Sequence, residues 1–299
     1  MISVIIPTYK NKEQLIKNLR HNLTYLEGCE VIIVNDYPQE NLNKDLREFK
    51  EIILIQNAKN LGFGLTVNRG AGVAKNKYIM LLNSDVILSN ARFKFPISSF
   101  EKNELLFAIS FAQKEKGGKI VGKNKLFWKA GLMRHQKAAD LNYGYNAWAE
   151  GGACLIDKDK FLRLGGFDQI YAPFYWEDID LSYRAWKSGY EVIFDPNVIV
   201  EHHHESTIGK YFSSQTIKTI SYRNQILFIW KNITDIKLLF SHLFFLFPNI
   251  IYFLIKREFS FSRGFFKALS KLNLVFQRRS SNKKTFIIND EKILKRFYE

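Results

Sequence analysis

Short apolar runs alternate with segments of helical spacing along the first part of the chain. Each run is brief and bounded by polar residues, as buried parallel strands usually are. Leu15, Leu19 and Leu23 give residues 11–25 the spacing of an amphipathic helix. Further helical segments are expected between the second and third runs and from Leu65 to Ala74. The pattern predicts an α/β fold with a mostly parallel sheet, right-handed crossovers and strands at Ile2–Pro7, Glu30–Val34, Ile52–Gln56 and Tyr78–Leu82.

A polar residue follows each of these four strands: Thr8, Asp36, Asn57 and Asp85. Ligands of an open α/β sheet bind beyond the carboxyl ends of its strands, so these side chains predict a polar crevice along one sheet edge. Asp85 follows Asn83 and Ser84, and its carboxylate can hold Mg²⁺ or Mn²⁺ against the phosphates of a nucleotide. An Asx turn or a helix cap is the simpler interpretation of the same stretch.

Two glycines, Gly62 and Gly64, precede the helix that begins near Leu65. A glycine-rich turn at the start of a helix can present backbone N–H groups to a phosphate. The stretch lacks the third glycine of a dinucleotide fingerprint and the Lys-Ser/Thr pair of a Walker motif. A simple tight turn therefore stays an alternative.

The second half of the chain predicts a less regular arrangement. Residues 113–147 are rich in Lys and Gly and then in aromatic residues, which indicates a long irregular excursion of the kind that often carries function. The elements expected after it are a strand at Glu150–Ile156, a helix at Lys158–Leu164, a helix that starts near Glu177 and ends at Gly189, and strands at Glu191–Phe194 and Val198–Val200.

Three carboxylates, Glu177, Asp178 and Asp180, stand within four residues, and the first two fall in the first turn of a predicted helix. Acids are stabilised there by the helix dipole, so capping alone would explain one of them. Three acids beside an aromatic cluster exceed what a cap needs, and one of them can act as a general base. Three adjacent histidines, His202 to His204, follow the last strand. They cannot all face one site, but one histidine beside a carboxylate can ligate a metal.

The last third of the chain is basic. Between Ile208 and Lys284, 14 Lys and Arg residues stand against two acids, a local balance of +12 in a chain whose formal net charge is +15. The anionic partner that this charge implies is a membrane surface, a phosphorylated lipid or nucleic acid. The basic residues stand among apolar aromatic runs and not on a polar face, which argues against nucleic acid.

The run Leu238–Ile255 carries no formal charge over 18 residues, close to the length of a membrane span. His242, Pro248 and Asn249 interrupt it, and a basic, aromatic-rich segment follows. We expect helices that lie in a membrane interface with Lys and Arg at anionic headgroups. A true span and a buried core helix are the alternatives, and residues 278–299 are expected to form a polar, partly disordered end.

Composition adds limits to this outline. The 299 residues, 46% of them hydrophobic, suffice for one large α/β domain with an appendage and exclude general disorder. Cys29 and Cys154 lack a metal-type spacing and predict core residues in a reducing compartment. The chain begins with a strand, so no secretory signal is expected.

A series of short motifs resembles glycosyltransferase family 2, the enzymes of GT-A fold, and within it the rhamnosyltransferase-like branch. Their order and spacing make the match specific over residues 1–207, and Tyr222-Arg223-Asn224 is a weaker echo beyond them. The motifs are Val4–Tyr9, Val34–Asp36, Asn60–Gly64 with Asn68–Gly70, Leu81–Asp85, Gly165–Asp168, Glu177–Leu181 and Pro196–His202.

The resemblance implies a role for each matching position. Asp36 would hold the base or ribose of a nucleotide sugar, Asp85 and His202 would ligate Mg²⁺ or Mn²⁺, and Asp178 would be the catalytic base. Further nucleotide-sugar contacts would come from Pro7, Thr8, Tyr9, Asn60, Gly62, Asn68, Arg69, Asn83 and Ser84. The sugar pocket for donor and acceptor would be formed by Trp148, Gly151, Gly152, Trp176, Glu177 and Asp180.

These residue types suit an inverting transfer. One base takes the proton of the acceptor hydroxyl and a metal stabilises the departing diphosphate, so a second carboxylate nucleophile is not needed. Two departures from the family pattern matter. Asn83 replaces the first acid of the Asp-X-Asp motif, and the usual Gly-Ser is absent after Asp36.

The sequence therefore predicts a metal-dependent glycosyltransferase with a catalytic domain at 1–207 and a basic helical tail at 208–299. The nucleotide-sugar half would cover about 1–112 and the acceptor half about 113–207. We expect a UDP-, dTDP- or GDP-linked donor, a saccharide acceptor carried on a polyprenyl diphosphate, and peripheral contact with the cytoplasmic face of the membrane. Asn83 keeps one alternative open, a catalytically lapsed membrane scaffold that binds nucleotide sugar or a partner enzyme.

Overall fold

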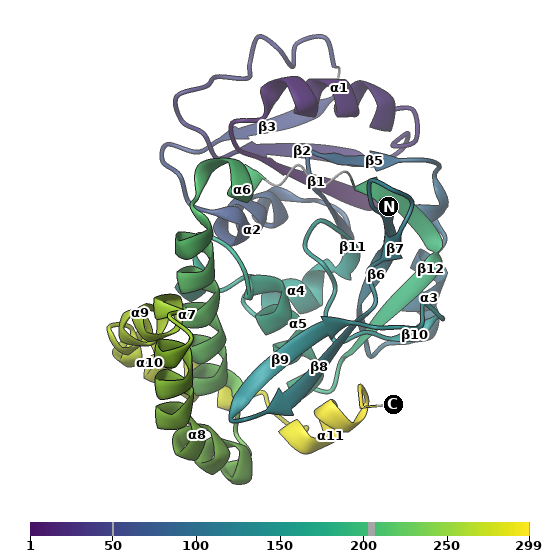
Figure 1. The fold of residues 1–299 in the computed structure, drawn as a ribbon. Helices are drawn as coiled ribbons and strands as arrows, with labels where there is room; N and C mark the ends of the chain where they lie inside the picture. The colour runs from purple at the N-terminus through teal and green to yellow at the C-terminus, as the bar shows by residue number, and fades with distance from the viewer. Residues whose placement is uncertain (50, 203–206, 299) are drawn as a thin grey trace.

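The computed structural model describes residues 1–49, 51–202 and 207–298. A mixed sheet runs through the centre, with helices packed on both of its faces (Figure 1). In the described residues the order along the main path is β10-β12-β6-β11-β4-β1-β2-β3, with β5 paired to β12 and β7 to β6. The predicted α/β fold is confirmed.

The first half of the sheet is parallel, as the sequence predicts. All four predicted strands form, and β1 lies between β2 and β4 in parallel register. Their carboxyl ends therefore meet at one edge. The elements are β1 (Ile2–Thr8), α1 (Lys12–Asn22), β2 (Glu30–Asn35), β3 (Ile52–Gln56), α2 (Phe63–Val73) and β4 (Tyr78–Leu82).

The second half of the sheet mixes directions. β11 runs antiparallel between β4 and β6, whereas β12 runs parallel to β6. The short β5 pairs with the end of β12, which brings His202 opposite Val86, the residue after Asp85. The strands are β5 (Val86–Leu88), β6 (Leu106–Lys114), β7 (Ile120–Val121), β10 (Gly144–Tyr145), β11 (Ala153–Asp157) and β12 (Glu191–His202).

Two hydrophobic clusters cover the two faces of the sheet. Val4 and Ile6 of β1 belong to one cluster and Ile5 to the other, because successive side chains of a strand point to opposite faces. The helices beyond the first half are η1 (Arg92–Lys94), α3 (Ile97–Lys102), α4 (Lys158–Arg163), η2 (Gln169–Tyr171), α5 (Glu177–Lys187), α6 (Thr207–Tyr211), α7 (Ser214–Asn232), α8 (Ile236–Ile255), α9 (Phe259–Leu269), α10 (Leu272–Lys283) and α11 (Asp290–Lys295).

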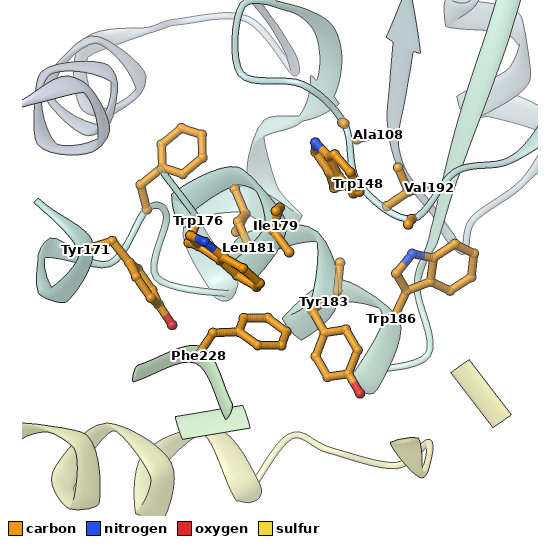
Figure 2. Packing of buried hydrophobic residues seen from close by; sticks show 14 of the residues in the cluster. Ala108, Trp148, Tyr171, Trp176, Ile179, Leu181, Tyr183, Trp186, Val192 and Phe228 are labelled. Atoms are coloured by element: carbon orange, nitrogen blue, oxygen red, sulfur yellow. The ribbon is translucent and has the colours of Figure 1, made fainter. Parts of the chain in front are cut away.

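Aromatic side chains join α5 and α7. Phe228 of α7 packs against Trp176 and Tyr183, with ring centroids 5.2 and 5.0 Å apart (Figure 2). The cluster on this face of the sheet contains residues of β1 and β4 as well as residues of α7, α9, α10 and α11. The helices after residue 207 thus pack directly on the α/β part, and the division at residue 207 stays a prediction.

Two predicted elements differ in the structure. No helix forms in the described residues between β2 and β3. The Asn35 amide donates to the carbonyls of Tyr37 and Glu40, and the Asn41 side chain accepts from the N–H of Asn43. Such local bonds compete with helical ones.

Residues 113–147 are not an irregular excursion. They contain β7, β10 and a hairpin of β8 (Asn124–Lys129) and β9 (Leu132–Lys137). The loop of this hairpin is Ala130-Gly131, and both residues have positive φ, 49° and 71°. A two-residue loop of that kind matches the twist of paired strands, and Ala at its first position is a weak sequence signal.

The C-terminal end is also ordered, contrary to the sequence prediction. In α11, Ile293 and Leu294 are buried, as is Phe297 just after it. Asp290 accepts from Lys187 at 2.9 Å and from Tyr183 at 2.6 Å. The partners lie about a hundred residues earlier in the chain, so the sequence gives no local sign of this docking.

The helix α8 is long and apolar enough to cross a membrane, and no other helix in the described part of the chain meets that test. Only 6% of its apolar window is buried, so the alternative of a core helix is wrong. Its polar residues point inward: His242 Nδ1 lies 2.7 Å from the Gly131 carbonyl, and Asn249 donates to the Ala130 carbonyl at 2.9 Å. The outward face is apolar.

Candidate active site

A cavity of about 510 Å³ opens at the carboxyl ends of β1, β2 and β4. It lies where the crossovers of the parallel strands place a ligand crevice. Fifteen of the predicted site residues line it: Pro7, Thr8, Tyr9, Asp36, Asn60, Gly62, Asn83, Ser84, Asp85, Trp148, Gly151, Gly152, Glu177, Asp178 and His202.

Asp36 shapes one end of the cavity. It is 4% exposed, and its Oδ1 accepts from Asn57 at 2.7 Å and from the N–H of Leu61 at 2.8 Å. Its Oδ2 accepts from the N–H of Gly62 at 2.8 Å. A carboxylate has about four acceptor positions, so one on Oδ2 is left over for a ligand. Asp36 thus fixes the turn that enters α2 and still faces the cavity.

Asp85 and His202 come together at the other end. Asp85 Oδ1 lies 3.3 Å from His202 Nε2, although 117 positions separate them in the chain. The neighbouring His203 and His204 lie outside the described residues. The antiparallel pairing of β5 with β12 produces this contact, since each residue stands beside the paired strands.

A chain of amide groups orients the His202 ring. Its Nδ1 lies 2.6 Å from Gln113 Oε1, and the Gln113 amide donates to Glu150 Oε2. Glu150 Oε1 also accepts from Asn124 at 2.9 Å. The Gln113 oxygen can only accept, so Nδ1 carries a proton, and in the neutral ring the lone pair on Nε2 faces Asp85.

Two acceptor atoms that face each other at 3.3 Å are complementary to a cation. Oxygen and imidazole ligands suit Mn²⁺, and Mg²⁺ is often held by one or two carboxylates together with substrate phosphates. In the described residues no group of three His, Cys, Asp or Glu side chains could hold a metal. The residues present therefore fit a divalent ion whose remaining ligands come from a diphosphate and water.

Two glycines allow close packing at this end of the cavity. A Cβ on Gly152 would meet Asn83 Nδ2 at 2.8 Å and the His202 ring at 3.4 Å. A Cβ on Gly151 would meet the Phe63 ring at 2.9 Å. Any larger residue at position 152 would displace the side chain that replaces the first acid of the Asp-X-Asp motif.

Glu177 and Asp178, the first residues of α5, also line the cavity. Removal from water raises the pKa of Asp178 to about 6, and the negative charge of Glu150 acts in the same direction. The N–H of Ile179, which donates to Asp178 at 2.8 Å, opposes this shift. Burial and the charge of Asp178 raise the pKa of Glu177 well above its usual range. Its buried Oε2 has no hydrogen-bond partner in the described residues.

The segment before α5 holds an unusual backbone. Tyr175 and Trp176 both have positive φ, 71° and 76°, a conformation that costs energy for aromatic residues. Asn224 of α7 compensates by donating to the carbonyls of Phe174 and Tyr175 at 3.0 and 2.8 Å. Arg223 donates to the Ala172 carbonyl at 2.6 Å. Arg223 and Asn224 of the Tyr222-Arg223-Asn224 motif thus form a clamp on the loop that leads to Asp178. The sequence did not reveal this role.

Four predicted site residues do not line the cavity: Asn68, Arg69, Trp176 and Asp180. Asn68 bridges to the backbone of Phe167 at 2.8 and 2.9 Å, and Arg69 contacts Asn57. Trp176 is buried in the aromatic cluster. Their effect on a ligand bound in this cavity can only be indirect.

Asp180 belongs to a buried ion-pair network beneath the cavity. It is fully buried and pairs with Arg184 at 2.8 Å and with Lys231 at 2.9 Å. Lys231 also pairs with Asp168 at 2.7 Å. These cations hold the pKa of Asp180 far below its usual range despite its burial. Asp180 thus ties α5 to α7 and does not form the pocket wall.

The cavity also has lining residues that the sequence did not single out. Gln113 and Glu150 are the polar ones, and their bonds to His202 and Asn124 connect positions far apart in the chain. The others are mainly apolar or aromatic: Phe63, Thr66, Pro173, Phe174, Tyr175, Ile208, Tyr211 and Phe212.

Comparison with known proteins gives a consistent result. The family model described as "Glycosyl transferase family 2" matches residues 3–162. The poly-beta-1,6-N-acetyl-D-glucosamine synthase of Staphylococcus epidermidis is 24% identical over 204 residues, which cover 66% of this chain and 48% of that protein. The N-acetylglucosaminyl-diphospho-decaprenol L-rhamnosyltransferase of Mycobacterium tuberculosis is 35% identical over 63 residues, 21% of this chain and 20% of that protein.

Among solved structures, GalNAc-T7 with UDP, GalNAc and Mn²⁺ has a TM-score of 0.62 at 16% identity, over 77% of this chain and 48% of that one. At this identity the likeness shows a shared fold, GT-A, and nothing finer. The chain spans about half the length of the curated relatives it matches, 48% and 44% for the first two.

Proposed function

This chain belongs to glycosyltransferase family 2, and on that premise we propose that it moves a sugar from a nucleotide-sugar donor to a saccharide acceptor, with inversion and with Mg²⁺ or Mn²⁺. The observation that carries the proposal is that Asp85, His202 and Asp178 all line one cavity, with Asp85 and His202 in contact. Cation ligands and a base are the two groups that an inverting transfer needs.

The donor would lie along the carboxyl ends of β1, β2 and β4. Its base and ribose would occupy the end at Asp36, next to Tyr9 and Asn60, and its diphosphate the end at Asp85. A divalent ion bound there would neutralise the charge that develops on the departing diphosphate. Asn83 can still accept a hydrogen bond from water or from a ribose hydroxyl. Without the first motif acid, the protein would supply two metal ligands, Asp85 and His202.

Asp178 is proposed as the base. A carboxylate with a pKa of about 6 is ionised at neutral pH and is more basic than an ordinary aspartate. Glu177, with its pKa held well above the usual range, would be protonated beside it and would donate a hydrogen bond to a sugar hydroxyl. The unlike environments of two adjacent acids would thus give them different protonation states.

The acceptor is proposed to be a saccharide on a polyprenyl diphosphate at the cytoplasmic face of the membrane, in the assembly of a cell-surface glycan. The support is the apolar outer face of α8, where Phe240, Phe244 and Phe247 are 65%, 73% and 68% exposed. Cations flank it at Lys237, Lys256 and Arg257. Apolar side chains ringed by Lys and Arg are typical of helices that lie in a membrane interface. The transferred sugar would be a hexose or a rhamnose.

The test is thermal stability against a panel of UDP-, dTDP- and GDP-sugars, with and without Mn²⁺. Ligand at about 100 Kd should stabilise the fold by roughly 2.7 kcal/mol. We expect a metal-dependent rise in Tm with one nucleotide class, which Asp85→Ala removes and Asp178→Asn retains. Transfer of the radiolabelled sugar should be lost in both variants.

The same panel distinguishes the enzyme from the alternative, a catalytically lapsed scaffold. A nucleotide-dependent shift in the wild type without turnover of any acceptor would favour a lapsed scaffold. A shift that is insensitive to both Mn²⁺ and Asp85→Ala would contradict the metal site. The lack of a shift with every donor class would contradict the proposed function itself.

A further inference from the structure

A second, smaller hollow of about 240 Å³ lies beside the active-site cavity. It is lined by residues of β9, α5 and α7: Arg134, His135, Trp176, Lys218, Ser221, Tyr222 and Gln225. The hollow thus carries two cations on a wall of aromatic and polar side chains. None of these residues belongs to the Asp85–His202 pair or to the donor end of the cavity.

Arg134 is the unusual member of this set. It is half-buried, and in the described residues its guanidinium has neither a hydrogen bond nor an ion pair. Lys218, by contrast, is paired with Glu258 at 2.5 Å. A half-buried arginine without a counter-charge is suited to bind an anion. Its planar guanidinium can form bidentate hydrogen bonds with a phosphate.

The hollow adjoins the active-site cavity through stacked rings. His135 lies edge-on to Trp176 at 5.5 Å and to Trp148 at 5.6 Å. Trp148 lines the cavity, whereas Trp176 lines the hollow, so the His135 ring lies against both. The hollow and the cavity therefore share a boundary that these three rings form.

On its other side the hollow reaches the apolar helices. Tyr222 packs against Phe253 of α8 at 5.3 Å and against Phe261 of α9 at 5.2 Å. The strand β9 also links α8 to the cavity. Gly131, in the turn before β9, contacts α8, and His135, four residues later, contacts Trp148. At about 3.3 Å per residue, roughly 13 Å separate the apolar helix from the cavity wall.

We propose that Arg134, assisted by Lys218, binds the diphosphate of a lipid-linked acceptor. Along β9 the order is the helix α8, whose outer face is apolar, then the cation Arg134, then His135 beside the cavity residue Trp148. This order matches the order lipid, diphosphate and sugar in such an acceptor. This inference rests on the proposed function, and it adds a site for the acceptor diphosphate distinct from the site for the donor diphosphate at Asp85. Arg134 is a binding residue and takes no part in the chemical step.

The test uses the full chain with farnesyl diphosphate as the probe and farnesol and inorganic pyrophosphate as comparison ligands, with binding measured by calorimetry in EDTA. We expect farnesyl diphosphate to bind the wild type and to bind Arg134→Gln about tenfold or more weakly, because a charge-assisted contact is lost. Asp85→Ala should bind it as the wild type does. Farnesol should bind more weakly than the diphosphate, and equally in both proteins.

The control is Arg20→Gln, which removes the same charge from α1, far from β9 in Figure 1. It should leave the affinity for farnesyl diphosphate unchanged. The nucleotide-dependent Tm shift should survive in Arg134→Gln, which also shows that this variant folds.

Three results would overturn the inference. The first is equal affinity of the wild type and Arg134→Gln for farnesyl diphosphate. The second is loss of that affinity in Asp85→Ala, which would put the probe in the donor site. Binding of inorganic pyrophosphate as tight as that of farnesyl diphosphate would mark a general anion site and contradict a lipid-linked ligand. Failure of the proposed function is distinguishable, since it appears as the lack of a nucleotide shift in the wild type.

Discussion

The acidity of Asp178 leads to a first prediction. If it is the base, kcat/KM should fall about tenfold for each pH unit below about 6 and level off above it, because only the ionised carboxylate can take a proton. The pH–rate profile at saturating Mn²⁺ measures this. Asp178→Asn should lose transfer at every pH, and a profile without this acid limb would contradict the assignment.

The same carboxylate should destabilise the fold at neutral pH. Its pKa is higher in the folded chain than in the unfolded one, near 3.9, so the folded form binds the proton more tightly. Stability should therefore fall as the pH rises from about 4 to about 6. Asp178→Asn should raise Tm at pH 8, and the gain should shrink toward pH 4. A Tm that is lower than that of the wild type at pH 8 would contradict this account.

The positions of the candidate site residues were predictable where a family motif places them at a strand or helix end, whereas their roles stay predictions. Asp85, Asp178 and His202 are of this kind, and all three line one cavity. The groups that orient them were not predictable, since Gln113 lies 89 positions from His202. A glutamine at the end of a buried strand has no local pattern that reveals its partner.

The clamp between α7 and the loop before α5 gives a prediction for a pair of elements. Asn224→Ala should leave the carbonyls of Tyr171, Phe174 and Tyr175 without this donor, at about 1–3 kcal/mol for an unsatisfied buried group. We expect a lower Tm and a fall in kcat that exceeds any change in nucleotide affinity, because the loop positions Asp178.

The matched control for the clamp is Asn197→Ala. Asn197 is exposed at the irregularity of β12, and among the described residues its side chain bonds only to Asp195, so Tm and kcat should both stay close to the wild type. Equal kcat for Asn224→Ala and the wild type would show that α7 supports the fold without positioning the base.

Elements with a strong local pattern were predictable, and those held by distant contacts were not. The parallel strands of the first half follow from apolar runs that stop at polar residues. The hairpin of β8 and β9 was missed because its turn is Ala-Gly. The helix α11 was missed because Asp290 finds its partners on α5 and in the turn between α7 and α8. A short polar segment becomes ordered when a fold built elsewhere offers buried donors.

The distribution of charge and apolar surface over the whole molecule supports a fixed orientation on a membrane. The basic surplus of the sequence lies after residue 207, and the exposed large apolar side chains are concentrated on α8, α9 and α10. The polar residues of α8 bond to the hairpin of β8 and β9, so one side of the helix packs on the rest of the protein. This arrangement favours a helix α8 that lies in the plane of the membrane interface over one that spans the membrane. It would place the hollow at Arg134 near the headgroups.

Replacing the outward aromatic residues of α8 should therefore detach the protein. In the triple variant Phe240→Ser, Phe244→Ser, Phe247→Ser, each loss removes at least about 1.5 kcal/mol of burial in lipid, so partition into vesicles should fall on the order of a thousandfold. Sedimentation with vesicles that contain anionic lipid measures this, and added salt should weaken only the part due to Lys and Arg. Phe95→Ser is the control, because Phe95 is 71% exposed beside η1, away from α8. Binding of the triple variant equal to that of the control would place the lipid contact elsewhere, and with it the route by which a lipid-linked acceptor reaches Asp178.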